Sequence, residues 1–323
     1  NYLKRKLTLR YIILGLIMAG LFQVFFWITQ DNRVSLIETS FEKVESLSYS
    51  PFEGYDKKVL SPEQIEEDVS MLSHFTTKLR TYSTADAKVI LEATSKTDIP
   101  IDLGIWISGD HKENHLEIQR ALKLLEKYPD NIANVIVGNE TLLRADLEEE
   151  ELFAYIDFVA EFTNKPITCA ETWDVWERIP DLAKHVDFIT IHILPYWEKV
   201  PINRFNDFII EKYTLVEKLF PYTKINIGET GWPSHGYNNN NAVPSLKNQA
   251  VAIRGFINLA SEKGWDYNIV EAFDQQWKGY DEGNVGQYWG IFTSDRELKF
   301  YLSGDIELNQ YWFYQMIAAI IIG

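Results

Sequence analysis

The chain has 323 residues, which suits one large α/β barrel but by itself leaves one domain or two open, and 46% of them are hydrophobic. Its 31 basic and 47 acidic residues give a net charge of −16. This balance argues against nucleic acid as the ligand, because phosphate binding needs clustered lysine and arginine. The single cysteine, Cys169, excludes an internal disulfide framework, and its apolar surroundings predict a packing role.

An uncharged apolar stretch at residues 11–29 is about the length that crosses a bilayer as one helix. Residues 1–10 carry four basic side chains, so the positive-inside rule predicts a cytoplasmic basic tail and an extracytoplasmic (periplasmic or extracellular) domain beyond the helix. No small-x-small cleavage site follows, which favours an uncleaved cell-membrane anchor over a removed signal peptide. Residues 30–43 are polar and predict an irregular linker.

A second apolar run closes the sequence at residues 311–323, but it is too short to span a membrane. It is either a docked terminal helix or, within residues 304–323, the start of a second transmembrane segment. The first residue is Asn1 and not methionine, which favours a piece cut from a longer membrane protein.

Between these ends, within residues 44–303, short apolar runs alternate with amphipathic ones such as 62–74 and 114–127. This alternation over about 260 residues predicts an α/β fold, a (β/α)8 TIM barrel preceded by one transmembrane helix. An open doubly wound sheet is the rival, but no Gly-rich phosphate turn follows any candidate strand. The eight candidate strands are 45–50, 78–83, 101–108, 134–140, 166–171, 187–194, 224–229 and 267–273.

Two carboxylates end candidate strands of this barrel. Glu140 closes "NVIVGNE" on the fourth strand, and Glu229 closes "KINIGE" on the seventh, 89 positions later. Catalytic groups gather at the carboxyl ends of barrel strands, so both side chains are expected to face one axial space. Two carboxylates about 5–5.5 Å apart are what a retaining glycosidase needs. Gly228 and Gly231, on either side of Glu229, are expected to let the backbone turn tightly.

Further side chains are candidates for the mouth of the barrel, although core packing is the competing interpretation for each of them. Arg80 and Tyr82 share parity at the end of the second strand, and an arginine there could lie beside Glu229. Tyr49 on the first strand and His192 at the end of the sixth are placed by the same reasoning. Tryptophans that follow strands five to eight could form sugar platforms: Trp173, Trp176, Trp197, Trp232, Trp277 and Trp289.

The sequence gives little support for a metal site or for a catalytic serine. His111 and His115 have i, i+4 spacing, but they lack an HExxH order and stand in a very polar segment, which predicts a solvated helix start. No G-x-S-x-G elbow occurs. Neither a metal nor another cofactor is therefore expected.

The chain resembles glycoside hydrolase family 17, the β-1,3-glucanase and glucanosyltransferase family, in particular its membrane-anchored bacterial members. The resemblance covers about residues 44–300 and is carried by four motifs in order: "VGNE" (137–140), "GETGWPSHG" (228–236), "EAFDQQWK" (271–278) and "YWGIFTSDRELK" (288–299). The chain departs from the plant-type pattern at Thr141 and Asn226, which leaves the two acids untouched.

The resemblance implies roles for individual residues. Glu229 would be the nucleophile and Glu140 the general acid/base, while Asn139 would hydrogen-bond the sugar 2-hydroxyl. The 271–278 segment would supply substrate contacts, so Glu271, Asp274, Trp277 and Lys278 are expected to bind sugar hydroxyls or ring faces. Asn139, Glu140 and Thr141 also spell an N-glycosylation sequon, which we interpret as accidental because a pocket asparagine could not carry a glycan and function.

The function expected from these features is a membrane-anchored retaining enzyme that forms a covalent glucosyl intermediate on Glu229. Glucanosyl transfer between a β-glucan or gluco-oligosaccharide donor and acceptor is favoured, because related bacterial chains can be fused through membrane helices to glycosyltransferase modules. The alternatives are a β-1,3-glucan hydrolase, a barrel glycosidase for another linkage such as β-1,4, and a non-catalytic module that guides a nascent glucan out of a synthase.

Overall fold

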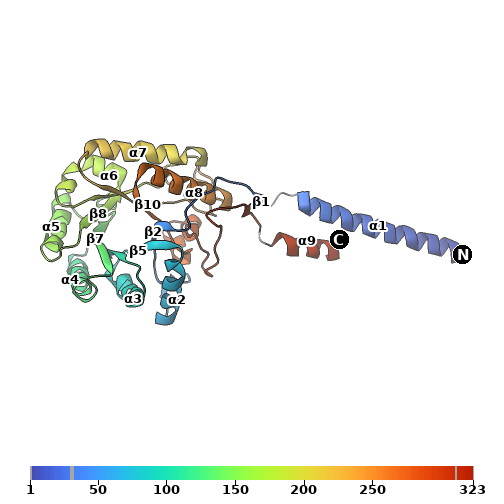
Figure 1. Cartoon of the computed structure of the whole chain (residues 1–323), viewed down its shortest axis with the longest axis horizontal. Helices are drawn as coiled ribbons and strands as arrows, with labels where there is room; N and C mark the ends of the chain where they lie inside the picture. The colour runs from blue at the N-terminus through green and yellow to red at the C-terminus, as the bar shows by residue number, and fades with distance from the viewer. Residues whose placement is uncertain (1, 30–32, 310, 323) are drawn as a thin grey trace. The chain divides into compact units, whose positions relative to one another are not determined.

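The computed structural model describes residues 2–29, 33–309 and 311–322. The chain divides into two compact units, one of residues 37–302 and one that joins residues 1–36 to residues 303–323. Figure 1 gives the element labels used below.

Eight parallel strands close into a barrel within residues 37–302, so the predicted (β/α)8 fold is confirmed. Each predicted strand overlaps one strand of the barrel, and the ring follows chain order, with β11 closing onto β2. The strands are β2 (Val44–Ser48), β5 (Thr76–Arg80), β6 (Ile101–Ile105), β7 (Ile132–Asn139), β8 (Ile167–Thr172), β9 (Ile189–His192), β10 (Ile225–Thr230) and β11 (Asp266–Ile269).

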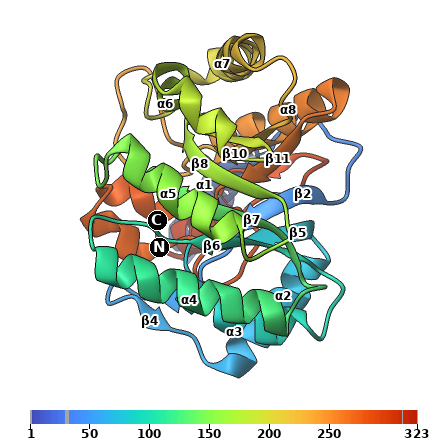
Figure 2. The same ribbon diagram turned by 90° about the vertical axis from the view of Figure 1, so that its left-hand side faces the viewer.

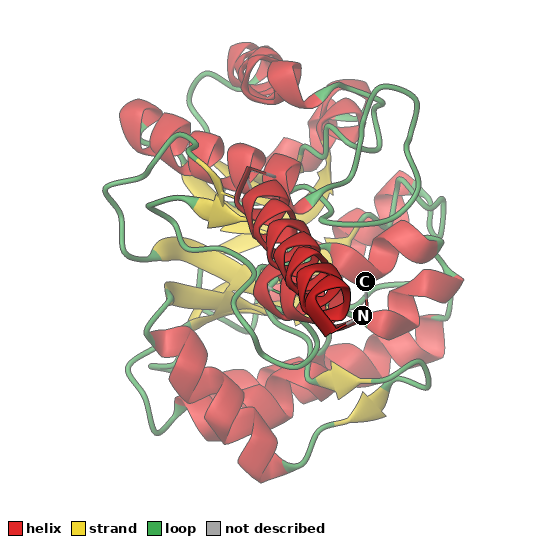
Figure 3. Cartoon of the chain, turned by 90° about the vertical axis from the view of Figure 1, so that its right-hand side faces the viewer, coloured by secondary structure: helices red, strands yellow, loops and turns green. Residues whose placement is uncertain are grey.

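Helices surround the strands, as Figures 2 and 3 show. The strands are therefore covered on their outer face and filled on their inner face, which is why a strand such as β10 is buried at all six positions. The α-helices of this unit are α2 (Pro62–Ser73), α3 (Thr84–Thr94), α4 (His111–Lys127), α5 (Glu149–Ala160), α6 (Trp173–Arg178), α7 (Phe205–Leu219) and α8 (Leu246–Lys263). Short 3-10 helices are η1 (Pro180–Lys184), η2 (Ile202–Arg204), η3 (Gln276–Tyr280) and η4 (Asn284–Tyr288).

Helix boundaries follow local capping chemistry. Ser61 caps α2 in a reciprocal box with Gln64, and Pro62 at the first helical position has its φ already set for a helix. Asp110 accepts backbone N–H bonds from Lys112 and Glu113, so α4 starts three residues earlier than the predicted 114–127 segment.

Two loops at the carboxyl ends of strands carry structure that matters for the site. After β2 the chain forms a small hairpin of β3 (Phe52–Glu53) and β4 (Lys58–Val59). After β11 it forms η3 and η4 before the chain pairs again through Phe292.

The smaller unit holds α1 (Tyr2–Thr29), a two-stranded antiparallel pair of β1 (Arg33–Val34) with β12 (Ile306–Glu307), and α9 (Trp312–Ile322). By length and composition, Lys6–Ile28 could cross a membrane, and it is the one such span among the described residues. Within the segment predicted as a linker, 30–43, the two residues of β1 are paired, and residues 30–32 lie outside the described residues. The apolar α9 has 11 residues, and its membrane role stays a prediction.

Candidate active site

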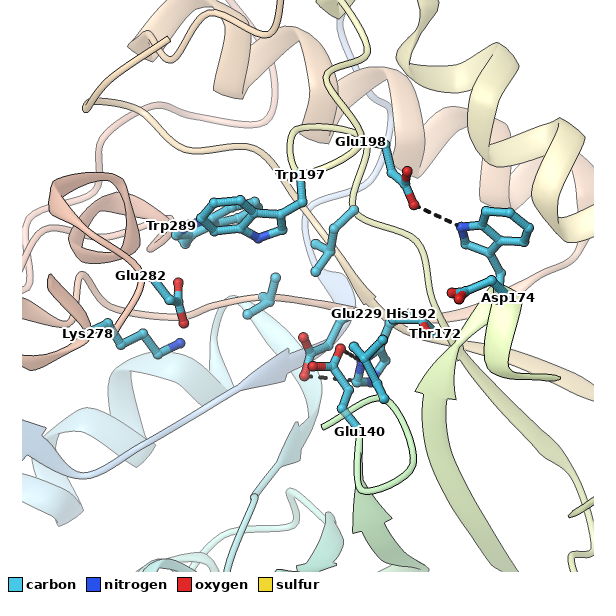
Figure 4. Close-up of a pocket in the computed structure, with 14 residues that line it drawn as sticks. Glu140, Thr172, Asp174, His192, Trp197, Glu198, Glu229, Lys278, Glu282 and Trp289 are labelled. Atoms are coloured by element: carbon cyan, nitrogen blue, oxygen red, sulfur yellow. Dashed lines mark hydrogen bonds and ion pairs between the residues drawn. The ribbon is translucent and has the colours of Figure 1, made fainter. Parts of the chain in front are cut away.

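The mouth of the barrel holds a cleft in two halves. Cavities of about 660 Å³ and about 690 Å³ lie on either side of four residues that line both: Glu140, Glu229, Lys278 and Glu282. The first half, drawn in Figure 4, has walls from the loops after β8, β9 and β11. The second has walls from the loops after β2, β5, β6 and β11. Both halves therefore open at the carboxyl ends of the strands, where (β/α)8 barrels carry their chemistry.

Glu229 sits on β10 at the floor of this cleft and is only 8% exposed. The Tyr82 hydroxyl donates a hydrogen bond of 2.8 Å to its Oε1, and a guanidinium nitrogen of Arg80 lies 3.5 Å from the same oxygen. Burial and the neighbouring Glu229 carboxylate raise the pKa of Tyr82 well above its usual range. Tyr82 is therefore a neutral donor, and Glu229 is held by one hydroxyl and one cation.

Arg80, on β5, is 1% exposed and contacts residues of β7, β9 and β10 below the cleft. Its guanidinium donates to the Gly228 carbonyl and, over 2.7 Å, to Asn139 Oδ1, and it lies 3.3 Å from His192 Nε2. Because Asn139 is held by this contact and lines the cleft, its side chain is poorly placed to carry a glycan.

Gly228 and Gly231 serve close packing and not the expected tight turn, because neither has a positive φ. A Cβ at Gly228 would stand 2.3 Å from Thr190 and 3.1 Å from Arg80, and one at Gly231 would stand 2.5 Å from the Val270 carbonyl. Glycine at 228 thus makes room for the arginine beside Glu229.

Glu140 follows the last residue of β7 with a positive φ of 54°, just after Gly138 at 84°. Non-glycine residues rarely adopt this conformation, and it turns the Glu140 side chain toward His192, whose Nδ1 lies 2.7 Å from Glu140 Oε1. His192 Nε2 lies 3.3 Å from Arg80 and 3.6 Å from Glu229 Oε1. A guanidinium only donates, so a hydrogen bond from Arg80 to Nε2 leaves Nδ1 as the ring nitrogen that donates to Glu140.

The pKa of Glu140 reflects these opposing surroundings. Burial alone would raise it, but the contact with His192, together with Arg144 and Arg80, outweighs burial and leaves the pKa lowered. A carboxylate oxygen of Glu140 and one of Glu229 lie within 4.8 Å of each other, with a His192 ring nitrogen in the same group. Such a group has ligand types that could hold a cation, but Arg80 already places a positive charge against it.

Across the cleft from the two acids, Lys278 and Glu282 come from η3 and the turn after it (Figure 4). The Lys278 ammonium lies 3.0 Å from both carboxylate oxygens of Glu271, which is 1% exposed. Burial raises the pKa of Glu271 to about 7 against the opposing effect of Lys278. Burial alone would lower the pKa of Lys278, but Glu271 and Glu282 outweigh it and raise the value.

The structure brings most of the predicted site residues together: Glu140, Glu229, Asn139, Tyr82, His192, Trp277 and Lys278 line the cleft, and Arg80 and Glu271 support it. Three others lie elsewhere. Trp232 is fully buried and donates to the Val243 carbonyl, so it packs the core instead of binding sugar. Tyr49 is 1% exposed and donates to Asp68. Asp274 lines neither half of the cleft; its Oδ1 pairs with Lys299 at 2.6 Å and accepts from the Gly290 N–H at 3.0 Å.

Among the tryptophans left open by the sequence, Trp176 is fully buried, whereas Trp173, Trp197 and Trp289 line the first half of the cleft. The rings of Trp197 and Trp289 stack with centroids 5.9 Å apart (Figure 4).

Sequence reasoning missed Glu171, at the end of β8. Its two carboxylate oxygens accept the backbone N–H groups of Leu142 and Leu143 at 2.7 and 3.3 Å, so it holds the turn that carries Glu140. Burial raises the pKa of Glu171 to about 7, against those two hydrogen bonds. The rule that found Glu140, an acid ending a barrel strand, would also have found Glu171.

The model of the BtgE/BtgC glycoside hydrolase domain matches residues 46–290. The chain belongs to this glycoside hydrolase family. It is thus an enzyme of the glycosidase and transglycosylase class, and the predicted relation to glycoside hydrolase family 17 is confirmed.

Similar proteins cover most of the enzyme domain. A glucan 1,3-beta-glucosidase of Schizosaccharomyces pombe is 28% identical over 73% of this chain and 79% of its own length, and one of Saccharomyces cerevisiae is 26% identical over 76% and 86%. The solved structure of a family 17 beta-1,3-glucanosyltransferase from Rhizomucor miehei is 25% identical, with a TM-score of 0.73 over 80% of this chain and 97% of its own.

Proposed function

We propose that this chain is a retaining β-1,3-glucan-active enzyme with Glu229 as nucleophile and Glu140 as general acid/base, and that it transfers glucan segments to a glucan acceptor. One observation carries the proposal: two carboxylates, one on β10 and one directly after β7, have oxygens within 4.8 Å of each other. That spacing is close to the roughly 5–5.5 Å between the two carboxyl groups of retaining enzymes and below the roughly 6.5–9.5 Å of inverting ones. The names of the relatives support the β-1,3-glucan substrate.

In the first step, a Glu229 oxygen attacks the anomeric carbon and the glycosidic C–O bond breaks, while Glu140 gives its proton to the leaving oxygen. Arg80 and Tyr82 hold the attacking carboxylate in place through the contacts on its Oε1. In the second step, Glu140, now ionised, takes the proton of an incoming hydroxyl, whose oxygen displaces Glu229 from the anomeric carbon. Water as that hydroxyl gives hydrolysis, and a sugar hydroxyl gives transfer.

The two halves of the cleft suit the two partners of transfer. Asn139, the expected 2-hydroxyl ligand of the donor sugar, lines only the half that also holds Trp277. His192, the partner of Glu140, lines only the other half, where the leaving group departs and the acceptor arrives. Trp173, Trp197 and Trp289 form apolar walls there. Aromatic faces pack on sugar rings, and a bound sugar excludes competing water, which favours transfer.

The test is to incubate residues 37–302 or the full chain with one β-1,3-linked gluco-oligosaccharide of defined length and to size the products over time. Products longer than the substrate support transfer, and shorter chains alone would leave hydrolysis. Trp197→Ala should move the product ratio toward hydrolysis, because it opens the acceptor half to water while leaving both acids in place. Glu229→Gln is the control that should bind the oligosaccharide without turnover. If the unaltered chain binds the oligosaccharide but does not turn it over, the guiding-module alternative is favoured.

We further propose that α1 anchors the domain in the cell membrane with the barrel outside the cytoplasm, and that a glycosyltransferase module continues the chain after α9. The apolar Lys6–Ile28 span and the basic residues before it support the anchor. Membrane fractionation of the full chain and of residues 37–302, with protease protection of the barrel, tests the anchor. The full reading frame beyond Gly323 tests the module.

A further inference from the structure

Two aromatic pairs join the β3–β4 hairpin to η3. Phe52 and Trp277 meet edge to face with ring centroids 6.2 Å apart, and Tyr55 and Tyr280 meet in the same manner at 6.4 Å. Each pair takes one ring from the hairpin and one from η3, and in both segments the two rings are three residues apart. In a 3-10 helix, side chains three apart lie on one face. We call these four rings the aromatic track.

The inner pair of the track is part of the cleft, because Phe52 and Trp277 both line its donor half. The outer pair is exposed to solvent: the side chain of Tyr55 is 54% exposed and that of Tyr280 is 76% exposed. The track therefore leads from the cavity that holds Glu140 and Glu229 to the open surface.

The hairpin that carries the track is held in place, which a binding surface needs and a mobile loop lacks. Glu53 and Lys58 pair across it at 2.9 Å, and the Tyr55 hydroxyl reaches Gln287 Oε1, in η4, at 3.5 Å. Lys57 lies with its ammonium 4.1 Å from the ring centroid of Trp277 and 4.7 Å from that of Phe52. It places three hydrogen-bond donors directly beside the apolar faces.

Apolar faces with hydroxyl tips, next to one flexible donor, match a pyranose ring, which has a C–H face and a rim of hydroxyls. The net charge of −16 disfavours an anionic ligand, which is consistent with a neutral glucan. A glucan bound in the donor half reaches the outer tyrosines of the track when its chain is long enough to extend beyond the cleft.

We propose that the aromatic track binds the continuing donor chain outside the cleft, so that it sets a preference for long β-glucans over short oligosaccharides. This inference rests on the proposed function for its substrate. It predicts that the outer tyrosines act on donor length and leave the chemical step alone.

The experiment compares kcat/KM for total donor consumption, whether the product goes to water or to sugar, on β-1,3-gluco-oligosaccharides of increasing length. Its variants are Tyr55→Ala, Tyr280→Ala and the double variant. Tyr222→Ala is the matched control, because Tyr222 is a 99% exposed tyrosine just before β10, at the other end of the barrel. Aromatic contacts are worth about 0.5–1.5 kcal/mol, which is about two- to twelvefold in a binding constant.

We expect the double variant to lose about three- to tenfold in kcat/KM on the longest donors, mainly through KM, with the shortest turned-over donor and the Tyr222→Ala control unchanged. An equal loss on short and long donors, or no loss on any, would overturn the track. If the double variant still turns over donors and keeps the length preference of the unaltered chain, this inference alone is refuted. If the unaltered chain turns over no donor, the proposed function is refuted.

Discussion

The contact between His192 and Glu140 yields the sharpest prediction, because each ring nitrogen of His192 has its own partner. Nδ1 donates to Glu140 at 2.7 Å and Nε2 accepts from Arg80 at 3.3 Å. An asparagine side chain places its amide near the position of Nδ1, and a glutamine places its amide near that of Nε2. His192→Asn should therefore keep a donor for Glu140, and His192→Gln should keep an acceptor for Arg80.

The expected effect of His192→Gln is a higher pKa for Glu140. His192 is the first of the groups that hold this pKa down, and without its hydrogen bond the burial that raises the pKa is opposed only by Arg144 and Arg80. A hydrogen bond to a charged group contributes about 1.5–3 kcal/mol, and one pKa unit is about 1.4 kcal/mol. The Glu140 side chain is 24% exposed, so water replaces part of the bond and the lower bound applies. The shift should be about one pH unit.

The assay is the pH profile of kcat/KM, which reports groups of the free enzyme. Glu140 must be protonated to act as the acid, so activity falls as pH rises through its pKa. The basic limb should move up by about one pH unit in His192→Gln and much less in His192→Asn. Equal movement in both variants, or movement toward lower pH in the glutamine variant, would refute the assigned tautomer and the role of this contact.

Three further outcomes follow from the same contacts. Glu140→Gln should lower turnover of glucan by about 10²–10⁴-fold while largely sparing an aryl β-glucoside with an acidic phenol, because that leaving group needs no proton; equal losses on both substrates would count against the acid role. Arg80→Lys should lower kcat by at least about tenfold in a folded protein, since a single ammonium cannot serve Asn139, Gly228 and Glu229 as the guanidinium fork does; circular dichroism checks the fold, and unchanged kcat would contradict the positioning role. Burial, with help from Asp266, raises the pKa of Glu45 from 4.5 to about 7, so the folded state holds this proton more tightly than the unfolded state and stability should fall as pH rises from about 4.5 to about 7. Glu45→Gln should reduce this fall in Tm, and an unchanged slope would show that other groups cause it.

The parts of the fold that the sequence predicted are those with a strong local signal. Most barrel strands contain a short apolar run, and an acid stands at the end of the run on β7 and β10, so Glu140 and Glu229 could be found with no structure. Ring closure then follows, because eight consecutive βα units have few other ways to bury both faces of every strand.

The errors have physical origins that a sequence period does not show. Alternation along a strand tells which residues share a face, but in a barrel the inward face runs from the packed interior to the open mouth. Tyr49 has the opposite parity to Ser48, which contacts Tyr82 at the mouth, so its hydroxyl points outward and donates to Asp68 on α2. Trp232 follows Glu229 by three positions, but the chain carries it into the core beside Tyr196 and Phe205. How deeply a side chain is buried depends on the loops above its strand, and the conformations of those loops cannot be read from a periodic pattern in the sequence.

The environment of Glu140 bears on which half of the reaction the site favours. The resting enzyme lowers the pKa of this group, and that lowers the fraction of the protonated form that the first step requires. A sugar bound over the cleft removes water from the exposed part of the carboxyl, which raises its pKa and lets substrate binding supply the acid. Once the donor's leaving portion has departed, the lowered pKa returns and keeps Glu140 ionised, as a base must be. In the proposed reaction the His192 contact therefore opposes the first step and assists the second, in which Glu140 must be ionised when the incoming hydroxyl arrives.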